Sequence, residues 1–237
     1  MTYFYGHLFA IAPGIRGLFP ASMHAQRQRL YRALCAMAGL AEDGTAEDGT
    51  AEAEAAADPP AEESADEQAL AALGRAHRKF GVRPEHYAPF RAALLATGRH
   101  FAGGPPDAAR AEAAIAAAFD RAAGIMIAAA GADSKVAPAW WTAEVTRHEA
   151  AEPDVAVLTV KPDEPLRYLA GQHVPVQTPR WPRQWRSYSI VNPPRPDGTL
   201  TLRVKAIPGG LVSTALVYHT RPGDILLLGA PEGPAPD

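Results

Sequence analysis

Apolar residues recur every three to five positions through most of the first 132 residues, which is the spacing of helices that bury one face. The first forty residues predict two such helices, and prolines and glycines between residues 13 and 20 separate them. Two longer core helices are predicted within residues 84–132. Pro84 suits the first turn of the first of these two helices. Pro89 lacks a backbone donor, so we expect a kink in the same helix near Pro89. The apolar positions of the four helices are Phe4, Leu8 and Phe9; Leu30, Leu34 and Met37; Tyr87, Phe90, Leu94 and Phe101; and Ile115, Phe119, Ala122 and Met126.

After Pro138 the pattern changes to short β-branched and aromatic segments bounded by proline, glycine and aspartate. The predicted strands are Trp141–Val145, Val155–Val160, His173–Gln177, Ser187–Val191, Leu200–Lys205 and Ile225–Leu228. Six such strands are enough for a small antiparallel barrel. One helix, Leu211–His219, interrupts them, and Ala137 and Pro138 mark the predicted domain boundary.

The charges are unevenly distributed. The net charge of −3 gives no reason to expect a nucleic-acid or anionic membrane partner. Eleven acidic residues and no basic one lie from Glu42 to Glu67, which leaves the rest of the chain with 23 basic and 15 acidic residues. Residues 41–67 include the tandem repeat AEDGTAEDGT and have little to bury, so we predict a disordered acidic insert. An acidic interaction surface is the alternative.

Cysteine usage and hydropathy indicate a compartment. The single Cys35 excludes an internal disulfide and a multi-cysteine zinc site. No basic segment followed by an apolar one opens the chain, and Asp120 and Arg121 interrupt the most apolar stretch, Ala113–Ala132. We therefore predict a cytoplasmic protein with no membrane partner.

The string RSYS at residues 186–189 is the most specific local signal. Alternation along a strand places Arg186 and Tyr188 on one side and Ser187 and Ser189 on the other. An aromatic ring can stack on a flavin, a guanidinium suits a pyrophosphate, and a hydroxyl can bond the reactive edge of a flavin. An ordinary strand with one surface charge has the same pattern.

Two glycines form the second signal. Gly209 and Gly210 precede the one predicted helix of the β half, whose first N–H groups suit a phosphate. The alternative is a simple turn in which Ser213 or Thr214 caps the helix.

Four strings, AGQHV, RSYS, VKAIPGGLVS and PGDILLLGAPEG, closely resemble the FAD-binding barrel of the ferredoxin-reductase type in order and spacing. The resemblance implies that Tyr188 stacks on the isoalloxazine, Ser189 bonds near its N5 and Arg186 holds the pyrophosphate. It places His173 where many relatives have an aromatic ring beside the adenine. The cofactor-binding residues that it implies in this half are His173, Arg186, Ser187, Tyr188, Ser189, Gly210, Val212 and Ser213.

A lone helical histidine such as His77 is usually solvated or a cap, but haem iron needs one axial nitrogen on an apolar helical wall. The segments YFYGHLFAIAPGIRGLFP, AQRQRL and HRKFGVRPEHY, with the two alanine-rich helices, resemble a globin of the flavohaemoglobin type. That family joins a globin to the FAD barrel just described. The fold implied is a globin-like all-α domain at residues 1–138, then a six-stranded antiparallel Greek-key β-barrel at residues 139–237.

The resemblance implies a site for haem b. His77 would be the proximal iron ligand, Phe19 would pack against the porphyrin, and Leu30 would line the distal wall. Tyr5 and Gln26 would donate hydrogen bonds to bound dioxygen, and Tyr87 would lie on the proximal side. Without haem, Tyr5 and Phe19 would be core aromatics and Gln26 would face water.

The sequence departs from the family in three ways. The proximal glutamate falls at Ala130 on a gapless count, which would make the axial imidazole less basic. The first globin helix is missing from the expected pattern, and the acidic insert replaces a shorter connection. No G-x-G-x-x-G fingerprint marks the family's NAD(P)H domain, so that cofactor would act only through a missing domain or a partner.

The implied activity is nitric oxide dioxygenation, with O2 and NO as small-molecule ligands and FAD passing electrons to haem from an external reductant. Two alternatives remain, a non-catalytic gas-binding or sensing globin and an FAD-only electron-transfer fragment. No Ser-His-Asp spacing or His-Glu-x-x-His string suggests another chemistry.

Overall fold

The computed structural model describes residues 1–32, 65–101 and 107–233. The chain divides into two compact units. The helical unit comprises Met1–His77 and Val82–Lys135, and the β unit comprises Arg78–Gly81 and Val136–Asp237. The short segment Arg78–Gly81, directly after His77, therefore clusters with the β unit.

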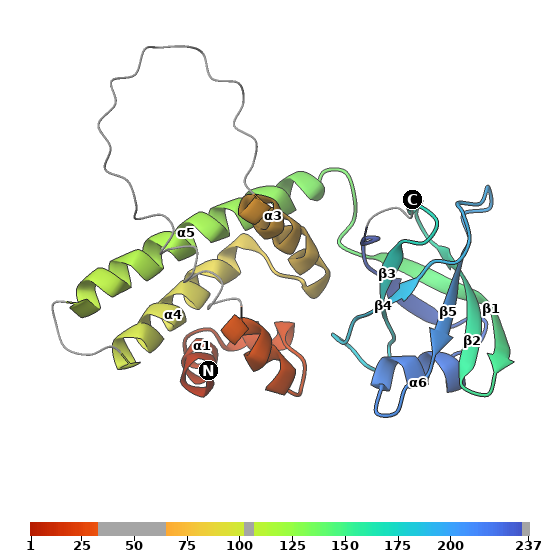
Figure 1. Ribbon diagram of the computed structural model, residues 1–237, viewed down its shortest axis with the longest axis horizontal. Helices are drawn as coiled ribbons and strands as arrows, with labels where there is room; N and C mark the ends of the chain where they lie inside the picture. The colour runs from red at the N-terminus through yellow and green to blue at the C-terminus, as the bar shows by residue number, and fades with distance from the viewer. Residues whose placement is uncertain (33–64, 102–106, 234–237) are drawn as a thin grey trace, which may run out of the picture. The chain divides into compact units, whose positions relative to one another are not determined.

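The helical unit contains the predicted helices (Figure 1). Residues 24–32 are helical, and the predicted apolar positions Leu34 and Met37 lie outside the described residues. The other elements are α1 (Thr2–Ile11), η1 (Pro13–Leu18), α3 (Ala65–His77), η3 (Pro84–His86), α4 (Tyr87–Phe101) and α5 (Asp107–Asp133).

Two local expectations need correction. The predicted disordered insert extended to residue 67, but Asp66 and Glu67 form the first turn of α3, where their charges face the positive end of the helix dipole. Residues 41–64 lie outside the described part. Pro89 is the third residue of α4, where an N–H has no intrahelical acceptor, so its missing donor costs the helix no hydrogen bond.

An aromatic cluster forms the core of the helical unit between α1 and α4. Phe4, Tyr5 and Leu8 are almost fully buried, and the Phe4 ring lies edge-on to Phe90 with centroids 4.8 Å apart. Each such side chain contributes about 1.5–3 kcal/mol when fully buried. Burial of one face of each helix therefore explains why the spacing in the sequence predicted these helices.

Helices α3 and α5 meet at a glycine. A Cβ added to Gly74 would lie 2.3 Å from the Met126 carbonyl oxygen, which is far inside van der Waals contact. The missing side chain is therefore what allows the two helix backbones to approach.

We predict that Gly74→Ala destabilises the helical unit by about 2 kcal/mol, because the gain in helix propensity is smaller than the cost of separating packed backbones. Gly124→Ala in α5 is the matched control, since nothing lies within 4 Å of its added Cβ. That control should stabilise the unit by up to about 1 kcal/mol. Urea denaturation, monitored by far-ultraviolet circular dichroism, measures the free energy of unfolding of both variants. Equal stability of the two variants would contradict the close contact.

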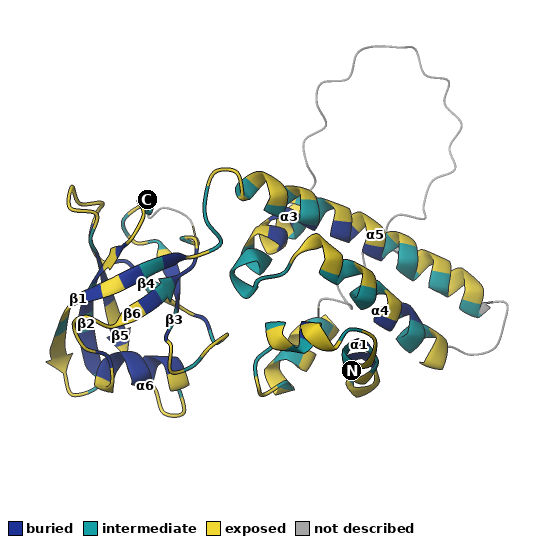
Figure 2. Cartoon of the chain, turned by 180° about the vertical axis from the view of Figure 1, so that it is seen from behind, coloured by how far each residue is buried: buried dark blue, intermediate teal, exposed yellow. Residues whose placement is uncertain are grey.

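Helix α5 is long and apolar. Among the described residues, Ala108–Asp133 is the one helix that could cross a membrane by length and composition. An 18-residue segment of this helix has a mean hydropathy of 1.5, and 22% of that segment is buried. A core helix can pass the same test, so this is weak evidence for a membrane span. One face of α5 packs on α3 and α4, and Asp120 pairs with Arg91 of α4 at 2.7 Å. Figure 2 shows the exposed residues along its other faces.

The β unit is a curled antiparallel sheet with strand order β4-β3-β6-β1-β2-β5. The two edge strands meet at one further bridge, between Ile190 and Leu202, which brings the edges of the sheet together. The strands are β1 (Trp141–Glu152), β2 (Val155–Pro162), β3 (His173–Gln177), β4 (Arg186–Ser189), β5 (Leu200–Lys205) and β6 (Ile225–Leu228). All six were predicted. However, β1 runs seven residues longer, through two register shifts, and β4 starts one residue earlier and ends two earlier.

Helix α6 (Leu211–Tyr218) lies across one end of this sheet (Figure 1). It buries Val212, Leu216 and Val217 in the same core as the inward-facing strand residues, which are dark blue in Figure 2. The His148 ring on β1 shares a hydrogen bond of 3.0 Å with the Leu216 carbonyl oxygen. The helix is thereby fixed with its amino end beside Gly209 and Gly210.

Candidate functional site

Strands β3 and β4 carry five of the predicted flavin-site residues. His173 pairs with Ser189 across the two strands, and Pro175 pairs with Ser187. The Ser189 hydroxyl and His173 Nε2 lie 3.1 Å apart and share a hydrogen bond. The two serines thus have polar neighbours along one face of β4, as the alternation predicted.

Tyr188 lies against the core of the β unit. It is partly buried there, and burial raises the pKa of its phenol to about 12, although the nearby Arg186 guanidinium opposes the shift. The phenol therefore stays neutral at physiological pH. Arg186 itself is exposed and donates from Nη1 to the Trp185 carbonyl oxygen at 2.8 Å. A half-buried ring beside an exposed arginine has the features needed to stack on a flat ligand and to hold an anion.

The two glycines before α6 form a tight turn. Gly209 has φ of +73°, and the Gly210 N–H donates to the Ile207 carbonyl oxygen at 2.9 Å. A Cβ on Gly210 would lie 2.5 Å from both Ile207 Cγ1 and Ser213 Oγ. Glycine is therefore required at both positions, by backbone conformation in one case and by space in the other.

The amino end of α6 retains N–H groups suited to an anion. The first intrahelical bond runs from the Thr214 N–H to the Gly210 carbonyl oxygen at 2.9 Å. The N–H groups of Leu211, Val212 and Ser213 are the ones that a helix start leaves without an intrahelical acceptor. Phosphate binding by backbone groups of this turn stays a prediction that the geometry supports.

The Ser213 hydroxyl has another role than the predicted phosphate contact. It donates to the Gly210 carbonyl oxygen at 3.1 Å and accepts from the Ile207 N–H at 3.3 Å. Both bonds stabilise the turn, so Ser213 can offer a phosphate its backbone N–H but has already donated its hydroxyl proton. The alternative that Ser213 or Thr214 caps the helix is wrong, because the N-cap residue is Gly210 and no side chain caps an N–H of the helix.

His173 and Ser189 were predicted at different parts of the cofactor, the adenine and the flavin N5. Their side chains are 3.1 Å apart, so both would contact the same part of a bound FAD. The position of each side chain along FAD stays a prediction.

Sequence reasoning missed Glu232. This residue lies just after β6 in the loop that contains PGDILLLGAPEG, and its carboxylate accepts from Ser187 Oγ at 3.4 Å and from Lys79 Nζ at 2.7 Å. Glu232 and Lys79 both lie within strings quoted from the sequence, but neither was assigned a role there. Only its place within a string already tied to the flavin site could have singled out Glu232.

The helical unit brings together the four predicted distal residues. Phe19 lies edge-on to Tyr5 with ring centroids 5.6 Å apart, and Leu30 packs in the same apolar cluster. Burial raises the pKa of Tyr5, and the Gln26 amide is close enough to lower it in part. The Tyr5 hydroxyl is buried and has no partner that meets hydrogen-bond geometry among the described residues.

His77 ends α3, and its ring contacts the backbone of the preceding turn. Its Nδ1 lies 2.7 Å from the Leu73 carbonyl oxygen. A carbonyl only accepts, so Nδ1 carries the proton and Nε2 carries the lone pair that a metal would take. This backbone acceptor orients the ring as carbonyl partners commonly orient metal-binding histidines.

Tyr87 and Ala130 lie on other elements of the helical unit. Tyr87 begins α4, and burial raises the pKa of its phenol. Ala130 is half-buried on α5 and offers no acceptor to an imidazole. The described contacts do not join either residue to His77.

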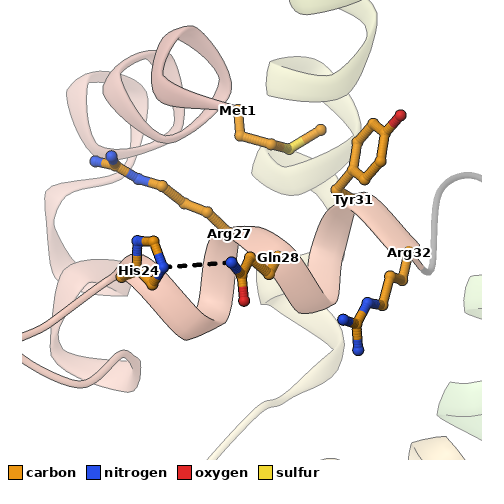
Figure 3. A pocket seen from close by; sticks show the side chains of 6 residues that line it. All are labelled: Met1, His24, Arg27, Gln28, Tyr31 and Arg32. Carbon is orange, nitrogen blue, oxygen red and sulfur yellow. Dashed lines mark hydrogen bonds between the residues drawn. The ribbon is translucent and has the colours of Figure 1, made fainter.

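A surface depression of about 410 Å³ lies elsewhere on the helical unit (Figure 3). It contains none of the predicted site residues. The guanidinium groups of Arg27 and Arg32 point to different sides of the helix in Figure 3. The lining residues are Met1, His24, Arg27, Gln28, Tyr31 and Arg32.

Comparison with known proteins identifies the β unit. Residues 142–235 match the family model described as the oxidoreductase FAD-binding domain. This stretch of the chain is therefore similar to an FAD-binding oxidoreductase domain.

Two curated relatives each match a part of this chain. The electron transfer component of xylene/toluene monooxygenase from Pseudomonas putida is 34% identical over 92 residues, which are 39% of this chain and 26% of the relative. An NADPH oxidoreductase from Mycobacterium tuberculosis is 39% identical over 88 residues, 34% of this chain and 23% of the relative. The chain thus spans roughly a quarter of the length of these relatives.

One solved structure is similar along nearly the whole chain. A flavohaemoglobin from Malassezia yamatoensis, with FAD and haem bound, matches 98% of this chain and 58% of its own, with a TM-score of 0.68 and 18% identity. At this identity the likeness concerns the fold alone.

Proposed function

We propose that the chain is a haem- and FAD-binding oxidoreductase that converts nitric oxide and dioxygen to nitrate, using electrons from an external reductant. The FAD-binding domain at residues 142–235 and the fold likeness to a flavohaemoglobin support this proposal. The observation that carries the haem half is Tyr5, whose ring lies edge-on to Phe19 near Gln26 and whose buried hydroxyl has no partner of regular hydrogen-bond geometry among the described residues.

The residues of the β unit fit FAD. Tyr188 would stack on the flavin, Arg186 and the N–H groups before α6 would hold the pyrophosphate, and Ser189 would bond the flavin edge. Gly210 supports this fit, since a Cβ there would fill the turn. When bound, FAD supplies the chemistry of accepting electron pairs and passing on single electrons.

The residues of the helical unit fit haem, so we propose a globin-like domain within residues 1–138. His77 would hold the iron through Nε2, because Nδ1 donates to Leu73. Phe19 and Leu30 would line the porphyrin pocket. When bound, haem supplies an iron centre that takes up dioxygen.

Tyr5 and Gln26 would position the gas. A neutral phenol donates one hydrogen bond, and the raised pKa of Tyr5 keeps it neutral. The side-chain amide of Gln26 donates as well. An apolar wall with two donors favours a ligand that gains partial negative charge over one that does not.

The electron donor would be another protein or domain. The matched relatives are by name an electron transfer component and an NADPH oxidoreductase, and this chain covers about a quarter of each. Ala130 in place of an acceptor would leave the axial imidazole less basic, so turnover would be slower than in a flavohaemoglobin with that acceptor.

The test uses the full chain reconstituted with haem and FAD, supplied with a chemical reductant, dioxygen and NO. We expect one nitrate per NO consumed, and dioxygen to leave Tyr5→Phe roughly 10 to 100 times faster than wild type, because a hydrogen bond to a charged acceptor is lost. Stopped-flow spectroscopy measures the dissociation. In the protein without haem, Tyr5→Phe should instead raise stability by about 1 kcal/mol, because the buried hydroxyl has no partner. Wild-type consumption of NO without nitrate would contradict the proposal.

A second candidate is flavin-dependent electron transfer without haem. The curated relatives favour it, because their matches cover only 34–39% of this chain. A purified chain that binds FAD and shows no Soret band after addition of haem would support this candidate over the first.

A further inference from the structure

We propose that Glu232 is a positioning residue of the flavin site, whose negative charge, balanced by Lys79, sets how readily the bound flavin accepts electrons. The inference rests on the proposed flavin site at β3 and β4. It adds a charge pair whose members lie within the strings PGDILLLGAPEG and HRKFGVRPEHY but were not assigned a role from the sequence.

The backbone holds Glu232 against the start of β3. The His173 N–H donates to the Glu232 carbonyl oxygen at 3.0 Å, and the Glu232 N–H donates to the His173 carbonyl oxygen at 2.7 Å. The Gln172 side chain adds a bond to the Gly233 carbonyl oxygen at 2.9 Å. Three bonds to two adjacent residues leave the loop little freedom, so the position of the carboxylate is well determined.

The carboxylate bridges two side chains. Oε2 accepts from the Ser187 hydroxyl at 3.4 Å, and Oε1 accepts from Lys79 Nζ at 2.7 Å. The Lys79 side chain is 13% exposed, and its Cδ lies 3.3 Å from where a Cβ on Gly229 would stand. An ammonium with so little access to water needs a counter-charge, which Glu232 supplies, and the centroid of the Phe80 ring lies 5.8 Å from Nζ.

The pair lies on the face of β4 that carries the predicted flavin contacts. Ser187 and Ser189 are two residues apart and project to the same side of the strand. Ser187 contacts Glu232, and Ser189 contacts His173, whose backbone is bonded to Glu232. The carboxylate is therefore joined through short contacts to the side chain expected at the reactive edge of the flavin.

Coulomb's law gives the sign of the effect. Reduction adds electrons to the flavin, and a fixed carboxylate nearby opposes the added charge while a fixed ammonium favours it. The positive charge of Lys79 partly cancels the effect of the Glu232 carboxylate on flavin reduction. Removal of one charge should therefore shift the flavin potential in the direction set by the charge that remains.

The experiment is a potentiometric titration of the bound flavin in the full chain, followed by its visible absorbance. At the potential that half-reduces wild type, Glu232→Gln should show at least roughly three times the wild-type ratio of reduced to oxidised flavin, and Lys79→Met at most roughly a third of it. The ratio of reduced to oxidised flavin in the double variant should lie between the ratios of the two single variants. Glu149→Gln is the matched control, because Glu149 forms an exposed ion pair with Arg147 at 2.8 Å on β1 and should shift nothing.

Unchanged potentials in both single variants, or shifts of the same sign, would overturn the inference. Flavin fluorescence measures whether FAD binds at all, so it separates an unshifted potential from failure of the proposed flavin site. A wild-type chain that does not bind FAD would overturn both the site and the inference, whereas a chain that binds FAD with an unshifted potential would overturn the inference alone.

Discussion

We expect His77→Ala to lose the Soret band of the reconstituted protein and to keep its flavin absorbance. The haem content should fall below about a tenth of wild type, because the substitution removes the one nitrogen proposed to hold the iron. The flavin should stay, since every residue proposed to bind it lies in the β unit. Absorbance spectra before and after dithionite and carbon monoxide measure both groups.

His100→Ala is the matched control for this experiment. His100 is an exposed histidine in the last turn of α4, stacked on Tyr3 with ring centroids 4.1 Å apart. Its removal should leave both spectra unchanged. Added imidazole should restore part of the Soret band to His77→Ala, because a free imidazole can fill the space that the side chain leaves. A full Soret band in His77→Ala without imidazole would show that another residue holds the iron.

Tyr188→Ala has the second largest expected effect, a loss of FAD with haem retained. The substitution removes the stacking surface, worth about 1–3 kcal/mol, so FAD affinity should fall roughly 10- to 100-fold. Titration of flavin fluorescence measures the affinity, and circular dichroism checks that the β unit still folds. The folding check matters because Tyr188 also packs against the core.

Two variants separate stacking from other roles of the ring. Tyr188→Phe keeps the ring and removes only the hydroxyl, so it should bind FAD within a few-fold of wild type. Tyr218→Ala removes an exposed tyrosine of the same unit, whose hydroxyl donates to the Pro153 carbonyl oxygen, and it should bind FAD normally. Loss of FAD in Tyr188→Phe would mean that the hydroxyl, not the ring, makes the essential contact.

Local patterns predicted most of the fold. Strands β3, β5 and β6 were placed with correct bounds because turn residues delimit them and their side chains are buried in the sheet core. The length of β1 was missed because its second half is polar and mostly exposed, and it stays a strand by pairing with β2. Alternation cannot report a strand that has no buried face.

Some predictions relied on local motifs and others on composition alone. The string RSYS and the glycine pair could be singled out from the sequence because each acts through neighbours in the chain. One is a strand that alternates, and the other precedes a helix start that exposes N–H groups. Asp66 and Glu67 were assigned to the insert on composition, although acidic residues are also favoured in the first turn of a helix. Composition alone cannot tell these two settings apart.

By itself, the sequence determined the order of helices and strands, the turn at Gly209 and Gly210, and the residue types offered to a flavin and a haem, because these depend on spacing within one element. Only the tertiary structure decided that Lys79 meets Glu232, 153 positions later, and that His173 meets Ser189. It also decided that the Ser213 hydroxyl braces a turn and that the Tyr5 hydroxyl is left without a partner. A hydrogen bond or ion pair requires two atoms within about 3 Å, and for residues far apart in the chain that distance follows from strand register and helix packing.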